Sequence, residues 1–199
     1  VEHMGGGFGS KFGLGFEGAA ACRLAKMTGK PVHLMLTRGD EFLAAGNRSG
    51  SRQSLRGGAS KDGRLLAFLG EVEKHGGVGG GSFPGRGPYI YSVEKSFVRV
   101  GSVYTNTDSS RAMRAPGHPQ ACFGIESLVD ELAYAIGMDP LEFRKKNLAD
   151  PVYHRQLDAV ELTPSQDVGR GDAAEATPHQ ASKALVLGRG ERFLPGRIE

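Results

Sequence analysis

The stretch QACFGIESLVDELAYAI, residues 120–136, carries the clearest structural pattern in the chain. Its apolar positions recur at helical spacing and predict an amphipathic helix with one face in a core. That stripe consists of Phe123, Ser127, Leu128, Leu132 and Ile136. Three acids, Glu126, Asp130 and Glu131, lie largely outside the stripe, so we expect them on the solvated face of this helix.

Helices are also predicted on both sides of this stretch. Downstream, Asp139 can cap a helix that has Pro140 at its first position and Glu142 at its third, and we expect it to run to about Leu148. Upstream, the alanine-rich residues 17–27 predict a helix that ends before Gly29. Residues 40–45 predict a helical turn.

Four segments have the composition of strands. Residues 52–59 and 64–74 flank an Asp-Gly turn and predict a β-hairpin. Residues 93–104 alternate well enough for a further strand, and the short apolar run 31–36 is typical of a buried one. Together with the helices they predict an α+β fold, in which helices pack on a mixed sheet. Residues 1–160 carry this pattern, whereas 161–199 lack a period and read as an irregular tail, either disordered or unrelated to the rest.

Composition limits the possible functions. The 199 residues are 39% hydrophobic and 24% charged with a net charge of +3, which fits an ordinary globular protein rather than a nucleic-acid-binding one. We expect no membrane span and no membrane partner, because no window approaches 18 consecutive apolar residues. Cys22 and Cys122 form no C-x-x-C pair, so we expect two small residues buried in helices and no iron–sulfur cluster in this chain.

Two unusual loops indicate a binding site. Residues 5–11 read GGGFGSK, where glycines permit positive φ and bring main-chain N–H groups close to an anionic ligand. Residues 111–120 read RAMRAPGHPQ and directly precede the patterned helix. Because each loop leads toward a helix, we expect the two loops to form one split site.

Glycine patterns leave a different reading open. The first loop lacks the Gly-Lys-Ser/Thr order of a phosphate-binding P-loop. Gly13, Gly15 and Gly18 do fit G-x-G-x-x-G, which is the pattern of a nicotinamide-dependent dehydrogenase, although no apolar strand precedes them. A non-catalytic α+β binding module is the third alternative.

Several separated motifs, taken in order, resemble the molybdenum-binding large subunit of the xanthine dehydrogenase and aldehyde oxidase family. The resemblance covers about residues 1–160 and implies an internal fragment of a molybdenum hydroxylase, part of its molybdopterin-binding domains. It rests mainly on MGGGFGSK (4–11), TGKPV (28–32), LTR (36–38), RAMRAPGHPQ (111–120), ESLVDEL (126–132) and DPLEFRKKNL (139–148).

The resemblance implies a role for several residues. Gly6, Gly7, Phe8 and Gly9 would pack main-chain amides against molybdopterin, with Phe8 and the backbone of Arg114 close to the molybdenum. Gln120 would hold the dinucleotide end of the cofactor, which we expect to be the cytosine dinucleotide form. The family's catalytic glutamate lies outside this chain, so we expect no catalytic residue here and no activity from the fragment alone.

The resemblance also implies partners and a substrate class. Iron–sulfur centres and FAD would lie in other domains or subunits and carry electrons away. Purine-oxidising members have a glutamate where this chain has Phe12, a phenylalanine where it has Pro116, and an arginine near residues 82–86. We therefore expect an aldehyde or an aromatic N-heterocycle, hydroxylated with oxygen from water. We expect a cytoplasmic protein and keep the periplasm as the alternative, because the chain opens without an initiator methionine and reads as an internal piece.

Overall fold

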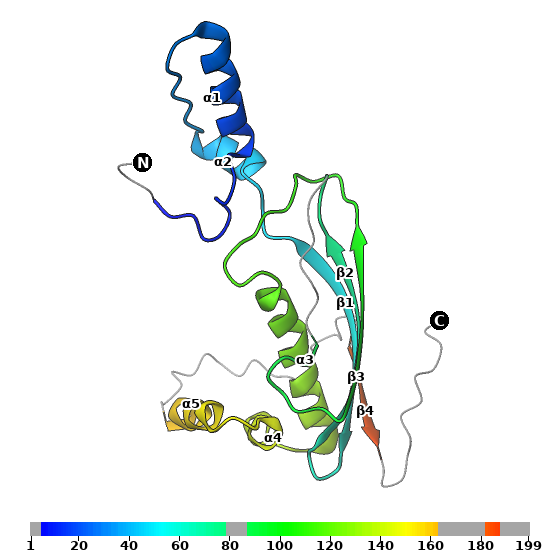
Figure 1. Ribbon diagram of the computed structural model, residues 1–199. Coiled ribbons are helices and arrows are strands. Elements are labelled where there is room, and N and C mark those ends of the chain that lie inside the picture. The colour runs from blue at the N-terminus through cyan, green and yellow to red at the C-terminus, as the bar shows by residue number, and fades with distance from the viewer. Residues whose placement is uncertain (1–4, 79–86, 163–181, 188–199) are drawn as a thin grey trace. The chain divides into compact units, whose positions relative to one another are not determined.

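The computed structural model describes residues 5–78, 87–162 and 182–187 (Figure 1). In these ranges the chain forms five helices and four strands, in the order α1 (Gly15–Thr28), α2 (Arg38–Ala44), β1 (Gly50–Ser60), β2 (Leu65–His75), β3 (Lys95–Val103), α3 (His118–Ile136), α4 (Pro140–Asn147), α5 (Pro151–Leu162) and β4 (Ser182–Leu187). The described residues divide into two compact units. The first unit combines residues 5–51, 73–78 and 101–119, and the second combines 52–72, 87–100, 120–162 and 182–187.

The strands form one mixed sheet with the order β3-β2-β1-β4. The predicted hairpin between β1 and β2 is confirmed: the Ser60 N–H donates to the Arg64 carbonyl at 2.9 Å, and Gly63 supplies a φ of 88° in the turn. β4 pairs with β1 in parallel, from Leu55 opposite Ser182 to Ser60 opposite Leu187. The α+β class with a mixed sheet is therefore confirmed.

The core of the second unit lies between α3 and the sheet. Leu128 and Leu132 of α3 are at most 1% exposed and pack in one cluster with Leu55 of β1 and Phe68 of β2. Burying side chains of this size stabilises the fold by about 1.5–3 kcal/mol each. The close approach of α3 requires Gly57, because a Cβ there would lie 2.7 Å from Leu132 Cδ1.

Arg144 joins α3 to α4 through ion pairs. These pairs contradict the expectation that the acids of α3 lie only on its solvated face. The Arg144 side chain, 17% exposed, contacts Glu126 through Nη2 at 2.8 Å and Asp130 through Nη1 at 2.6 Å. Tyr91 donates its hydroxyl to Glu126 at 2.8 Å, and burial together with that carboxylate raises the pKa of the phenol. Glu131 is the exposed one of the three acids.

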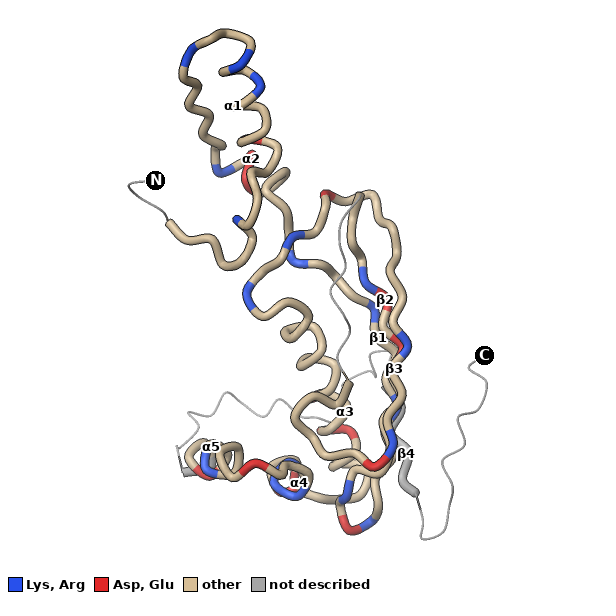
Figure 2. Tube along the Cα trace, viewed as in Figure 1, with Lys and Arg blue, Asp and Glu red and all other residues tan. Residues whose placement is uncertain are grey.

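The cap of α4 is as predicted. Asp139 accepts hydrogen bonds from the N–H groups of Leu141, at 2.8 Å, and Glu142, at 3.1 Å, with Pro140 at the start of the helix. α5 follows after a short connection, and Lys145 of α4 contacts Asp158 of α5 at 3.0 Å. Lysine and arginine gather along α4, and further basic segments lie along α1 and the loop that follows it (Figure 2).

Four sequence-based expectations are wrong. Residues 31–36 are irregular, and Met35 is 78% exposed instead of buried in a strand. Phe123 lies off the core face of α3 at 80% exposure, because the buried face is centred on Leu128 and Leu132. Cys22 is exposed because α1 buries none of its residues in the described structure. Glu126 and Asp130 are ion-paired, as described above.

Within the irregular tail expected over 161–199, the structure describes only the last two residues of α5 and the strand β4. The remainder of that expectation lies outside the described residues and stays a prediction. Among the helices of the described ranges, none combines the length and apolar character needed to cross a membrane.

Candidate functional site

The two loops singled out in the sequence meet within the first unit. The N–H of Arg114 donates to the carbonyl of Phe8 at 2.5 Å. A Cβ placed on Gly9 would lie 3.6 Å from the Arg114 nitrogen, so the two backbones run against each other at ordinary contact distance. The expectation that the loop around Phe8 and the loop around Arg114 lie together is therefore confirmed.

The first loop is a tight turn with unusual backbone angles. Gly6 has a φ of 117°, Phe8 of 49° and Gly9 of 91°. Both the N–H and the hydroxyl of Ser10 donate to the Gly7 carbonyl, at 2.8 and 2.9 Å. Positive φ at these positions lets the backbone turn sharply, which is a conformation found in loops whose N–H groups bind anions.

The second loop is held by a side chain that the sequence did not single out. Arg48 donates from Nη2 to the carbonyl of Arg114 at 2.8 Å. The N–H of Arg111 donates to the Asn47 carbonyl at 2.9 Å, and Asn47 forms a parallel bridge with Ser110. Segment 47–48 therefore fixes both ends of residues 111–114. No periodicity links Arg48 to Arg114, so only the three-dimensional arrangement identifies it.

A cavity of about 260 Å³ opens beside the first loop. Its wall consists of Gly9, Ser10, Phe12, Gly13, Gly15, Arg111 and Ala112. In the described part of the chain, the N–H groups of Gly9 and Ala112 donate to no other residue. Among the described residues, this wall combines glycines, main-chain amides without an acceptor and one arginine, so a ligand can approach the backbone closely.

The remaining candidate residues are placed as follows. Phe12 lines the cavity and is 88% exposed. Pro116 is half-buried and is not part of the cavity wall. Gln120 belongs to the second unit, in the first turn of α3, where its carbonyl accepts a hydrogen bond from Gln53 Nε2 at 2.7 Å. The arginine expected near residues 82–86 lies outside the described residues.

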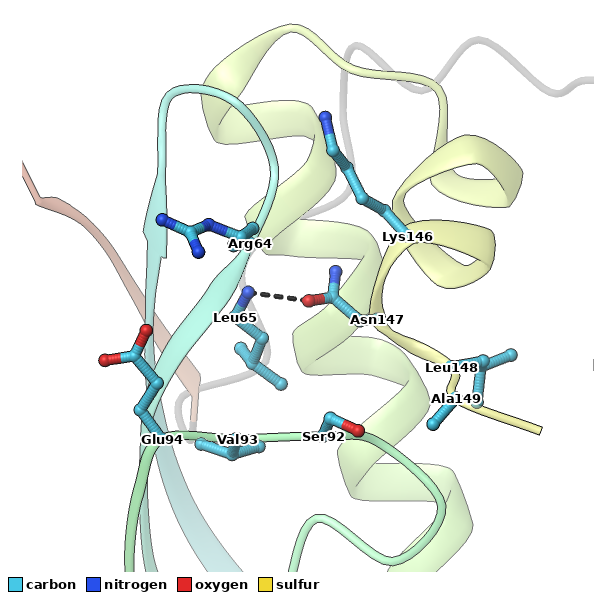
Figure 3. A pocket seen from close by; sticks show the side chains of 9 residues that line it. All are labelled: Arg64, Leu65, Ser92, Val93, Glu94, Lys146, Asn147, Leu148 and Ala149. Carbon is cyan, nitrogen blue, oxygen red and sulfur yellow. Dashed lines mark hydrogen bonds between the residues drawn. The ribbon is translucent and has the colours of Figure 1, made fainter.

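A second cavity, of about 400 Å³, lies in the second unit (Figure 3). At its centre the Leu65 N–H donates to Asn147 Oδ1 at 2.7 Å, while Asn147 Nδ2 donates to the Gly63 and Phe143 carbonyls. Figure 3 shows the charged side chains at its rim extending away from this hydrogen bond. Its central polar groups are satisfied by the fold itself, so the cavity beside the first loop is the candidate site.

Protein side chains alone do not form a metal centre in the described ranges. No group of three or more His, Cys, Asp or Glu residues there is placed to hold a metal ion.

Comparison with known proteins agrees with this geometry. Residues 1–148 match the protein family described as the molybdopterin cofactor-binding domain. The chain belongs to this family. The match to the molybdopterin cofactor-binding domain spans both loops, the hairpin and the helices α3 and α4.

Individual relatives of this molybdopterin cofactor-binding domain are much longer proteins. The chain is 34% identical over 167 residues to the xanthine dehydrogenase molybdenum-binding subunit of Escherichia coli O157:H7, covering 80% of the chain and 22% of that protein. Among solved structures, the aldehyde oxidoreductase of Desulfovibrio gigas has a TM-score of 0.64 at 33% identity, over 74% of the chain and 17% of that structure. The quinoline 2-oxidoreductase of Pseudomonas putida 86 has a TM-score of 0.63 at 26% identity, over 75% of the chain and 20% of that structure. The chain thus spans about a fifth of each relative.

The family assignment replaces the nicotinamide alternative. A dinucleotide-binding βαβ unit needs strands on both sides of the glycine pattern. In the described ranges, no strand precedes α1, which begins at Gly15, and residues 31–36 after it are irregular. Gly13 and Gly15 instead contribute to the cavity wall beside the first loop.

Arg48 is expected to matter for cofactor retention although it touches the site only through Arg114. In the complete enzyme, Arg48→Met removes a charged hydrogen bond to the Arg114 carbonyl, a loss of about 1.5–3 kcal/mol. Molybdenum content, measured by elemental analysis, should fall about tenfold or more, and Arg48→Lys should restore part of it. Arg52→Met, an exposed neighbour, serves as the control. Equal molybdenum in both methionine variants would contradict the positioning role of Arg48.

Proposed function

We propose that this chain forms part of the cofactor site in the large subunit of a molybdenum hydroxylase. The observation that carries the proposal is the contact between the two loops, where the Phe8 carbonyl accepts from the Arg114 N–H beside the glycine-walled cavity. We propose that the whole enzyme hydroxylates an aldehyde or an aromatic N-heterocycle with water as the oxygen source, and that this fragment is inactive alone.

In this proposal the main chain does most of the binding. Gly6, Gly7 and Gly9 present amides to the molybdopterin, and positive φ at Gly6 and Gly9 supports that role. Phe8 and the backbone of Arg114 lie beside the metal, and the hydrogen bond between them holds the two loops at a fixed spacing. When bound, the molybdenum cofactor supplies the redox chemistry that oxidises an electron-poor carbon.

The finer assignments are also part of the proposal. Gln120 contacts the dinucleotide end of the cofactor, in its cytosine form. Iron–sulfur centres and FAD in other domains or subunits accept the electrons, and the location is cytoplasmic, with the periplasm as the alternative. The names of the relatives support a molybdenum-binding subunit and an oxidoreductase. Cofactor extraction from the complete protein tests these points, through the identity of the nucleotide and the iron and flavin content.

The substrate pocket is proposed to contain Phe12 and Pro116. Phe12 at the cavity wall provides an apolar surface for an aromatic ring or an alkyl chain, whereas a buried purine edge would find no acceptor there. Leaving such an edge unpaired costs about 1–3 kcal/mol. Purines are therefore expected to be poor substrates of the complete enzyme.

Replacement of Phe12 tests this pocket. In the complete enzyme, kcat/KM for benzaldehyde divided by kcat/KM for hypoxanthine should fall about ten- to a hundredfold in Phe12→Glu. The introduced carboxylate supplies the missing hydrogen-bond acceptor for the purine. Steady-state kinetics with both substrates measures the ratio. Phe16→Glu adds the same charge on α1 outside the cavity wall and should leave the ratio unchanged. If the unmodified enzyme oxidises hypoxanthine faster than every aldehyde tested, the substrate assignment is wrong.

A further inference from the structure

We propose that Arg111 is an anion-binding residue, and that the cavity beside the first loop takes an aromatic ligand carrying an oxyanion such as a carboxylate or phosphate. This inference rests on the proposed function and goes beyond it, because it assigns a charge to the ligand. The presence of Arg111 and Phe12 in one cavity wall is the observation that carries it.

Among the residues that the structure describes, none is a hydrogen-bond or ion-pair partner of the Arg111 guanidinium. Among the described residues, no carboxylate lies within 4.0 Å of it and no carbonyl accepts from it. Arg111 is also the one ionisable residue in the described cavity wall. The carboxylate of Glu17, at the start of α1, lies next to Gly15 and does not pair with Arg111. A half-buried cation without a counter-charge favours an anionic ligand.

The stem of Arg111 is held in place by the neighbouring backbone. Gly46 has a φ of 83°, and a Cβ there would lie 2.9 Å from Arg111 Nε and closer still to Cγ and Cδ. The Arg111 side chain therefore passes directly over Gly46, while its own N–H is tied to the Asn47 carbonyl at 2.9 Å. A guanidinium fixed at its stem loses less rotamer freedom when it binds a planar carboxylate.

Phe12 favours a ligand whose remaining part is a flat ring. The ring lies in the same wall as Arg111, and the other wall residues are glycine, serine and alanine, which leave room for a flat group. A flat ring against Phe12 with a carboxylate or phosphate on Arg111 uses both features. The oxyanion has two possible sources, an acidic substituent on the substrate or the phosphate of the pterin cofactor, and the measurements below separate them.

Binding to the complete protein tests the inference without relying on turnover. Benzoate and its neutral analogue benzamide are titrated by calorimetry into the unmodified enzyme and Arg111→Gln. A charge-assisted hydrogen bond predicts about a ten- to a hundredfold weaker Kd for benzoate in Arg111→Gln, and a benzamide Kd unchanged within about twofold. Arg111→Lys should recover part of the benzoate affinity, and Arg155→Gln, an exposed arginine on α5, should have no effect.

Kinetics and cofactor content then identify the source of the oxyanion. If it belongs to the substrate, Arg111→Gln keeps its molybdenum and pterin, and kcat/KM falls about ten- to a hundredfold for 4-carboxybenzaldehyde but not for benzaldehyde. If it belongs to the cofactor, molybdenum and pterin content fall by a similar factor in Arg111→Gln and recover in Arg111→Lys.

Failure of the anion site and failure of the proposed function give different results. Benzoate affinity, cofactor content and both kcat/KM values within about twofold of the unmodified enzyme in Arg111→Gln would overturn the anion site while leaving the proposed function intact. A complete, folded, unmodified protein that carries no molybdenum would overturn the proposed function instead. Benzoate binding that depends on Arg111 would still support the anion site in that case.

Discussion

Replacing Gly9 with valine is expected to remove most of the molybdenum from the complete enzyme. Gly9 has a φ of 91°, which a β-branched residue adopts only with strain of about 1–3 kcal/mol. The added Cβ would also point at the backbone of residues 112–114, with the Arg114 nitrogen at 3.6 Å. Valine branches beyond that Cβ would push the two loops apart, so we expect at least a tenfold loss of bound molybdenum, measured by elemental analysis.

Controls separate this effect from general unfolding. Gly101→Val lies in β3, where no atom comes within 4 Å of the added Cβ and φ is not positive, so it should retain its molybdenum. Gly9→Ala carries the same φ strain with a smaller side chain and should give an intermediate loss. Gly9→Val with normal molybdenum content and a normal circular dichroism spectrum would contradict the role assigned to the first loop.

The second large effect concerns the contact between α3 and α4. Arg144→Met leaves Glu126 and Asp130 without their cation, and Glu126 remains against the buried Tyr91 hydroxyl. Removing one partner of a buried ion pair costs about 3–5 kcal/mol, and partial exposure of the two acids reduces this to roughly 2 kcal/mol. We expect amide exchange in α3 and α4 to become about thirtyfold faster in the complete protein.

Arg99→Met is the matched control for Arg144→Met. Its guanidinium is 77% exposed and lies 3.9 Å from Glu71, so its loss should change exchange by less than about threefold. If Arg144→Met leaves exchange in α3 and α4 at the rate of this control, the ion pairs do not stabilise the contact between the helices.

The sequence predicts an element correctly where a residue type favours one backbone conformation. The Asp-Gly turn specified the hairpin, since Gly63 has to adopt a positive φ. Asp139 with Pro140 specified the start of α4 through a cap that needs only neighbouring residues. The sequence predicts that the loops around Phe8 and Arg114 lie together, and their backbones do meet there.

Features that depend on distant parts of the chain were missed. The apolar run 31–36 predicts a strand that the structure does not form, because hydrophobicity alone does not supply a pairing partner. The role of Arg144 could not be predicted, because its ion pairs depend on how α4 packs against α3. Arg48 contacts the Arg114 carbonyl, and no periodicity encodes this contact, so it becomes visible only when the loops are placed together.

The most direct test is a structure of the complete protein with its bound cofactor. The account predicts that main-chain nitrogens of Gly9 or Ala112 lie within about 3.2 Å of cofactor atoms, which is hydrogen-bond distance, with the backbone of Arg114 in contact beside them. A pterin cofactor bound with no contact to either the first loop or residues 111–114 would contradict the central claim that these two loops form one cofactor site.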